Sequence, residues 1–214
     1  MSLPPPLPPE TRTVGQLVAE AVKLYQRRFW PSLALGVGPV ALAAATLGLD
    51  RVASLIVTTL AGGLLLSASY VGASALAGDA RPERRWLLAV AAGVLVFVPF
   101  PFLLLVFVLP GLAWLALVGL VVPVIVLERR GFGDAFRRAV ELARADYVHA
   151  LGSLATLALI VFVTQTVLIF LLRDFGEQTI RLASLLATLV ISPLLFLGAA
   201  LLYYDQAARA DRRR

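Results

Sequence analysis

The sequence contains no cysteine and a single histidine, His149. Disulfides, thiolate nucleophiles, zinc–thiolate sites and iron–sulfur clusters all need cysteine, and one histidine does not make a multi-histidine metal centre. Charge is also scarce, because only 15% of the 214 residues are Asp, Glu, Lys or Arg, against about 25% in soluble domains. We therefore do not expect a water-soluble globule, and we predict that the chain binds no metal and no other cofactor.

Apolar residues dominate what is present. They make up 60% of the chain, and the mean hydropathy is +0.89. The net charge of +6 arises from 19 Lys and Arg against 13 Asp and Glu. Such a balance suits anionic lipid headgroups, whereas nucleic acid is not an expected partner because apolar runs separate the basic clusters. The composition predicts an integral membrane protein.

Stretches without charged residues predict how often the chain crosses the bilayer. A crossing needs about 20 apolar residues. The third stretch, Trp86–Leu127, holds 42 residues, which would be about 63 Å as one helix, so it must turn back. Pro99 and Pro101, or Pro110 and Gly111, are candidate positions for this turn. We expect six crossings, at about residues 31–49, 52–77, 86–104, 108–127, 147–172 and 178–204.

The distribution of basic residues tests this count independently, since Lys and Arg concentrate in cytoplasmic loops. With six crossings and a cytoplasmic N-terminus, sixteen of the 19 basic residues lie inside, and only Arg51, Arg173 and Arg181 lie outside. A single crossing by Trp86–Leu127 would abolish this bias. We therefore predict that both termini are cytoplasmic.

Two amphipathic segments flank these crossings. The first, residues 13–29, begins with a capping box between Thr13 and Gln16; the second, residues 133–145, has Asp134 as its expected N-cap. Both are predicted to lie on the cytoplasmic leaflet. The predicted fold is all-α: a polytopic bundle of six transmembrane helices plus two interfacial helices. Residues 11–208 form one membrane domain, between a disordered proline-rich tail (1–10) and a basic tail (209–214).

Several short patterns resemble bacterial membrane families. The residues that carry the resemblance are Val14–Leu17, Arg27–Phe29, Pro123–Glu128, Gly131, Ala135, Arg138, Ala139, Glu141, Leu142, Arg144 and Tyr203–Asp205. Together they resemble the membrane domain found with some glycerophosphoryl diester phosphodiesterases and related six-helix families. Since the sequence contains no phosphodiesterase barrel, the resemblance implies a membrane architecture without hydrolysis. It also implies the bacterial cytoplasmic membrane as the location.

Few residues are candidates for chemistry. Glu128, at the end of the fourth crossing, is a boundary acid that could bind a cation but is expected to pair with nearby arginines. Gln165, between Thr164 and Thr166, is expected to form an interhelical hydrogen bond, with a polar path as the alternative. The candidate contacts to lipid headgroups are Arg27, Arg28, Arg129, Arg130, Arg137 and Arg138.

These residues do not make a catalytic constellation, so we expect no enzyme. The favoured interpretation is a non-catalytic scaffold or accessory protein that contacts lipid or a partner on the cytoplasmic face. The partner could be a second copy of the chain or another membrane protein. The alternative is an uncoupled permease or channel for an apolar or amphipathic solute.

Overall fold

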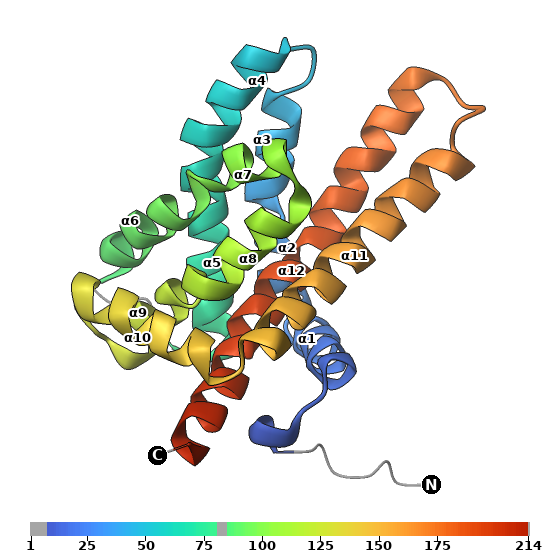
Figure 1. The fold of residues 1–214 in the computed structure, drawn as a ribbon. Coiled ribbons are helices and arrows are strands. Elements are labelled where there is room, and N and C mark those ends of the chain that lie inside the picture. The colour runs from blue at the N-terminus through green and yellow to red at the C-terminus, as the bar shows by residue number, and fades with distance from the viewer. Residues whose placement is uncertain (1–7, 81–84, 214) are drawn as a thin grey trace, which may run out of the picture.

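The computed structural model describes residues 8–80 and 85–213, which form helices and no strands (Figure 1). The first half contains a short 3₁₀ turn and a π-helical turn among its helices: η1 (Pro9–Thr11), α1 (Val14–Arg27), α2 (Phe29–Ala34), α3 (Val37–Ala45), α4 (Arg51–Val57), η2 (Thr58–Gly62) and α5 (Gly63–Ala77). The second half contains α6 (Trp86–Phe97), α7 (Phe100–Val106), α8 (Val108–Val118), α9 (Val121–Glu128), α10 (Phe132–Ala145), α11 (Tyr147–Leu171) and α12 (Glu177–Arg212).

Five helical segments are long and apolar enough to cross a membrane. They are Arg51–Ala77, Trp86–Val106, Val108–Glu128, Tyr147–Leu171 and Glu177–Arg212. The first predicted crossing corresponds to a shorter apolar segment, Phe29–Ala45. Within the described ranges the chain is thus an all-helical protein with several candidate membrane-spanning helices.

The long apolar stretch turns back between the two candidate positions, Pro99–Pro101 and Pro110–Gly111. Phe107 has an extended backbone (φ −172°, ψ 161°) and separates α7 from α8. Pro99 and Pro101 instead produce the bend between α6 and α7, and Pro110 lies in the first turn of α8. A proline in the first turn costs no hydrogen bond because the amides there have no intrahelical partner. Neither candidate position is therefore itself the turn.

The two ends of the chain differ from the expected tails. Helix α12 does not stop near residue 204 but continues to Arg212, so most of the predicted basic tail is helical. At the other end, residues 9–11 form a 3₁₀ turn, while residues 1–7 of the predicted proline-rich tail lie outside the described ranges. The last turns of α12 are held by side-chain contacts described below.

Both amphipathic helices are present, and their apolar faces pack largely on the protein itself. The capping box is confirmed, since the amide of Gln16 donates to the Thr13 side chain and the amide of Thr13 donates to the Gln16 side chain.

The N-cap expected at Asp134 is wrong, because α10 begins at Phe132 after Gly131. Asp134 lies instead in the first turn, where its charge suits the helix dipole. Ala135, Ala139, Leu142 and Ala143 are fully buried, and α10 packs against α8, α9 and α12.

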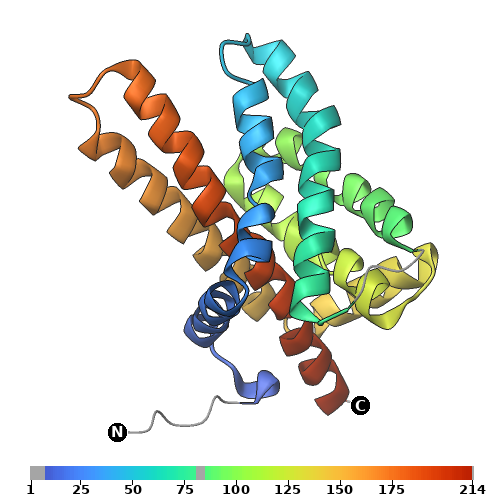
Figure 2. The same cartoon turned by 180° about the vertical axis from the view of Figure 1, so that it is seen from behind.

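Two lobes give the molecule its shape. Helices α11 and α12 form an antiparallel hairpin that diverges from α3, α4 and α5 toward one end, as the two opposite views show (Figures 1 and 2). The lobes meet along the other half of α12, which packs against α1, α3, α5 and α10. The core is concentrated there, on α5, α6, α9 and α12.

A proline and a glycine together define where α12 crosses α3. Pro193 lies inside α12 and has no amide hydrogen, so the carbonyl of Leu189, four residues earlier, lacks its usual helical partner. That carbonyl faces Gly36, at the junction between α2 and α3, so closely that a Cβ on Gly36 would lie 2.1 Å from the oxygen. Only glycine allows the two backbones to approach this far.

We predict that Gly36→Ala lowers the stability of the protein by about 2 kcal/mol or more, the cost of overpacking against rigid backbone. Apparent melting temperature in detergent measures the effect. Gly152→Ala is the matched control, because a Cβ at this helical position of α11 meets open space. The control should be neutral or slightly stabilising, and equal melting temperatures for the two variants would contradict the close contact.

Candidate functional site at the basic end

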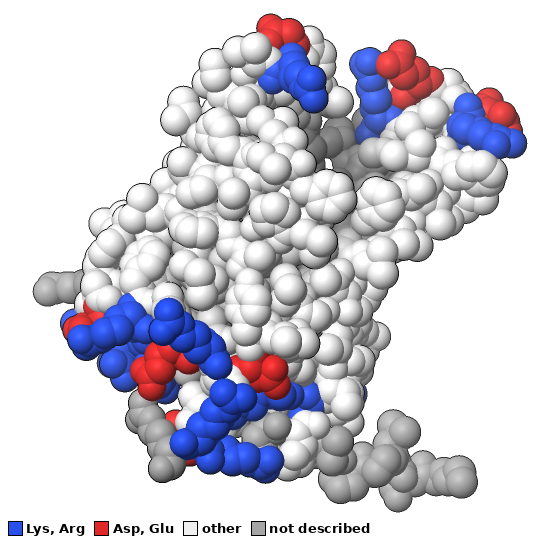
Figure 3. Space-filling model, in the orientation of Figure 1, with Lys and Arg blue, Asp and Glu red and all other residues white. Residues whose placement is uncertain are grey.

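Charged side chains gather at two opposite ends of the molecule. On the face seen in Figure 3, Lys, Arg, Asp and Glu cluster at both ends, and an apolar band separates them. We call the end formed by α1, α10 and the last turns of α12 the basic end. The opposite, distal end carries three pairs of charged residues: Asp50 and Arg51, Arg173 and Asp174, and Glu177 and Arg181. This separation is the pattern of a protein whose middle lies in hydrocarbon.

Glu128 is the centre of the first charged cluster at the basic end. It is the last residue of α9, and its Oε1 accepts from the Tyr203 hydroxyl at 2.9 Å and from Arg138 Nε at 3.3 Å. Its Oε2 accepts from Arg130 Nε at 2.5 Å. Both carboxylate oxygens are thus satisfied by the protein. The boundary acid pairs with arginines, which leaves it poorly placed to hold a free cation.

Arg138 is the most enclosed of the α10 arginines. Besides Glu128, its guanidinium lies 3.1 Å from Glu141 Oε1. Burial acts to lower the pKa of Arg138, but its interactions with Glu141 and Glu128 act to raise it, and the net pKa lies above the ordinary value. Arg138 therefore stays charged and balances the charge of Glu128.

Asp205 is the centre of a second cluster. It is fully buried on α12, directly after the end of the apolar part of the helix. Its Oδ1 accepts from Arg12 Nη1 at 2.8 Å, and its Oδ2 lies 3.4 Å from His149 Nε2. The acid thus joins the N-terminal segment, α11 and α12. A buried carboxylate needs such partners, because an unpaired charge is costly away from water.

The neighbouring side chains of α12 extend this second cluster. Gln206 donates to the Asp146 carbonyl at 2.9 Å and accepts from the Asp146 amide at 3.2 Å. Arg209 pairs with the Asp146 carboxylate and donates to the Arg12 carbonyl at 2.9 Å. Asp146 also caps α11 by accepting from the His149 amide. We call Arg12, Asp146, His149, Asp205, Gln206 and Arg209 the charge clamp.

Sequence reasoning missed most of the charge clamp. Asp205 directly follows the sixth predicted crossing, and Arg12 and Asp146 each directly precede a predicted helical segment, so their positions in the sequence do not mark them as site residues. One signal for the cluster is present in the sequence. Asp205 is a single acid directly after an apolar run, and no helix stop signal follows the run at that point. Its partners come from distant parts of the chain, and only the tertiary structure brings them together.

The predicted headgroup contacts fall into different environments. Arg138 is buried and paired, Arg130 pairs with Glu128, and Arg28 pairs with Asp79 at 2.7 Å. Arg27 is exposed at the end of α1, and Arg137 is 79% exposed beside Asp134. Arg129 is exposed and has a left-handed backbone (φ 55°) at the end of α9. Arg138 is therefore enclosed by the protein, whereas Arg27, Arg129 and Arg137 lie on its surface.

The polar residues of α11 lie within the hairpin or on its outside. Gln165 Nε2 donates to the Thr188 hydroxyl of α12 at 3.0 Å, which is an interhelical hydrogen bond. Thr164 is exposed and donates to the carbonyl of Ile160 in its own helix, and Thr166 is also exposed. The three residues thus do not face a common space.

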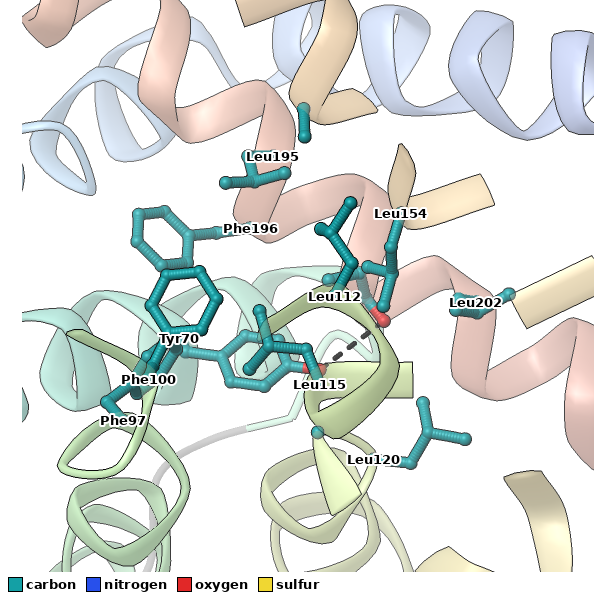
Figure 4. Close-up of a pocket in the computed structure, with 13 residues that line it drawn as sticks. Tyr70, Phe97, Phe100, Leu112, Leu115, Leu120, Leu154, Leu195, Phe196 and Leu202 are labelled. Atoms are coloured by element: carbon teal, nitrogen blue, oxygen red, sulfur yellow. Dashed lines mark hydrogen bonds between the residues drawn. The ribbon is translucent and has the colours of Figure 1, made fainter. Parts of the chain in front are cut away.

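An apolar cavity of about 90 Å³ lies between the two lobes (Figure 4). Aromatic rings from α5, α6, α7 and α12 gather on one side of it, and leucines from α8, α11 and α12 lie on the other. Tyr70 contributes the one polar side-chain atom of the lining, and this hydroxyl donates to the Ala199 carbonyl at 3.4 Å. The cavity is therefore suited to an apolar occupant.

Over the described residues, fold and site together define a class: an all-helical protein with several candidate membrane-spanning helices and with charged groups concentrated at its two ends. Comparison with protein-family models, with curated proteins and with solved structures gives no match to this chain. In the described part of the chain, no group of three or more His, Asp or Glu side chains is placed to hold a metal ion.

We predict that Asp205→Ala destabilises the protein by about 3 kcal/mol, because it leaves Arg12 and His149 buried without their carboxylate. The readout is the apparent melting temperature in detergent. Asp134→Ala is the control, since this acid forms an exposed pair with Arg137 and such pairs are worth about 1 kcal/mol or less. If the Asp205 variant is as stable as the Asp134 variant, the charge clamp does not contribute to the stability of the fold.

Proposed function

We propose that this chain is a non-catalytic multi-pass membrane protein that acts as a scaffold or accessory protein and binds anionic lipid headgroups at its basic end. The observation that carries the proposal is the exposed face of α10. Arg137 and Arg144 lie seven residues apart on one side of the helix, and they line a shallow groove together with Phe136, Val140 and Glu141. Cations flanking apolar side chains are the pattern of a helix at a membrane surface.

The proposal includes six crossings with both termini in the cytoplasm. Phe29–Ala45 would reach about 25 Å as a helix, close to the thickness of a thin hydrocarbon layer of about 27 Å. If this segment crosses, α1, α10 and the end of α12 share one side of the membrane. That arrangement agrees with the separation of basic residues in the sequence. The resemblance to bacterial families supports the bacterial cytoplasmic membrane as the location.

Aromatic residues near the basic end support an interfacial position for α1 and α10. Phe29 and Trp30 follow α1 and are exposed. The centroids of their rings lie 5.3 Å apart. Phe132 is exposed at the start of α10 and packs on Phe136. Aromatic side chains concentrate at the headgroup level of membranes. The two helices would then contact both the bundle and the lipid.

An uncoupled permease or channel has less support. Its polar path would require Gln165, Thr164 and Thr166 to line a common interior. Gln165 is occupied by Thr188, and the two threonines lie on the outside of the hairpin. We therefore keep the scaffold as the proposed function.

The headgroup contact is tested with Arg137→Gln combined with Arg144→Gln. Each arginine near an anionic surface contributes about 1 kcal/mol, so the pair should reduce preferential binding of phosphatidylglycerol by about thirty-fold. The measurement is the ratio of phosphatidylglycerol to phosphatidylcholine retained by the protein after extraction from mixed liposomes, determined by mass spectrometry.

The matched control removes the same charge from the distal end, with Arg173→Gln combined with Arg181→Gln. It should leave the lipid ratio unchanged. A loss of equal size in both double variants would indicate a dependence on net charge alone and would contradict a headgroup surface on α10.

The crossing number is tested with single cysteines in the full chain, which has none of its own. Leu49→Cys and Arg173→Cys should react with a membrane-impermeant maleimide added to intact cells, because the proposed topology places both loops outside. Lys23→Cys and Arg137→Cys should react only after the membrane is permeabilised. Labelling of Lys23→Cys in intact cells, or protection of Leu49→Cys, would rule out this topology.

A further inference from the structure

We propose that the cavity between the lobes binds the methyl-terminal part of a membrane lipid's acyl chain. This inference requires only that the protein lies in a membrane. It does not depend on headgroup binding at α10, because the cavity and the α10 groove share no lining residue.

Interruptions in three helices create the space. Phe97 and Phe100 lie on either side of the bend at Pro99, so both rings face the same cavity although they belong to different helices. Gly119, in the break between α8 and α9, lines the cavity without a side chain. Leu195 and Phe196 follow Pro193 in α12. The cavity is therefore a consequence of the fold, built from positions where regular packing is interrupted.

The chemistry of the lining excludes polar occupants. The Tyr70 hydroxyl already donates to the Ala199 carbonyl. All other lining side chains are apolar: they are phenylalanine, leucine, alanine and glycine residues. A trapped water needs two to four polar partners, and this lining does not provide them. What binds here has to be hydrocarbon.

Volume and depth identify which hydrocarbon. A dry cavity of about 150 Å³ accepts benzene, so about 90 Å³ suits a narrow linear chain better than a ring. Leu154 and Ala158 lie seven and eleven residues into α11 from Tyr147, about 10 to 16 Å along the helix from the basic end. The middle of a hydrocarbon layer of about 30 Å lies at a similar depth. Acyl chains place their methyl ends there.

Access from the membrane follows from the divergence of the lobes. Beyond Ala158 the hairpin is flanked by exposed apolar side chains, including Leu159, Phe162 and Leu186, and Figure 3 shows a notch between the hairpin and the other lobe. The cavity itself is partly open. A lipid chain can enter from the surrounding bilayer without passing any charged group of the two ends.

The test is photolabelling of the full-length protein in phosphatidylcholine liposomes that contain a trace of lipid with a diazirine on one acyl chain. One probe carries the diazirine at the methyl end, and a second carries it next to the ester. The methyl-end probe should label the cavity peptides around Leu112–Leu120 and Leu195–Leu202 at least five-fold more than the exposed hairpin peptide around Phe162–Phe170. The ester-proximal probe should not show this enrichment.

Two substitutions on neighbouring residues separate occupancy from exposure. Ala158→Phe fills the cavity and should remove most of the enrichment, whereas Leu159→Phe adds an aromatic ring on the exposed side and should leave it unchanged. Leu112→Ala enlarges the cavity and should increase the labelling, which covers the case in which Ala158→Phe does not fold.

The proposal is overturned if labelling follows exposure alone, if Leu112→Ala leaves cavity labelling unchanged, or if the cavity peptides cross-link to a second copy of the chain in place of the lipid. Loss of phosphatidylglycerol preference in the α10 double variant with intact cavity labelling would leave this inference standing. The two proposals therefore fail separately.

Discussion

The requirement that backbone amides and carbonyls be satisfied inside hydrocarbon shapes the rest of this molecule. Lipid offers no hydrogen bonds, so apolar segments fold as helices, and departures from helix need another helix or a tolerant residue nearby. The extended residue Phe107 sits at a turn between two spans. The carbonyl of Leu189, which loses its usual helical partner to Pro193, lies against Gly36. Each interruption of the helical pattern is thus located where the surrounding structure can accommodate it.

Helix α12 connects these features. Its 36 residues would extend about 54 Å, which is well beyond one hydrocarbon layer. Different parts of the helix therefore contact different parts of the protein. The distal half packs mainly on α11 and carries the bond between Gln165 and Thr188. From Leu189 onward, α12 crosses α3, lines the apolar cavity through Phe196 and then contributes Asp205 to the charge clamp. One helix therefore links the hydrocarbon-facing and the polar parts of the protein.

The basic end contains two populations of arginine with different roles. Arg12, Arg138 and Arg209 are largely enclosed and pair with carboxylates of the fold, of which Asp205 is fully buried. Arg27 and Arg137 project outward. Fewer positive charges lie on the surface than the number of arginines in the sequence suggests, because the enclosed arginines pair with carboxylates within the fold. This division leaves the outer side of α10 as the place for the headgroup contact that we propose.

The sequence by itself determined the helical class, the approximate bounds of the apolar segments and the capping box at Thr13, because these depend on local composition and on spacing within one or two turns. It also indicated that Glu128 would find arginine partners, since Arg129 and Arg130 follow it directly. Only the tertiary structure decided that Arg138 is enclosed, that Asp205 meets Arg12 and His149, and that three helix interruptions surround one cavity. Those contacts join residues from 10 to 193 positions apart, and the angle and depth at which helices pack, rather than any local pattern, bring them together.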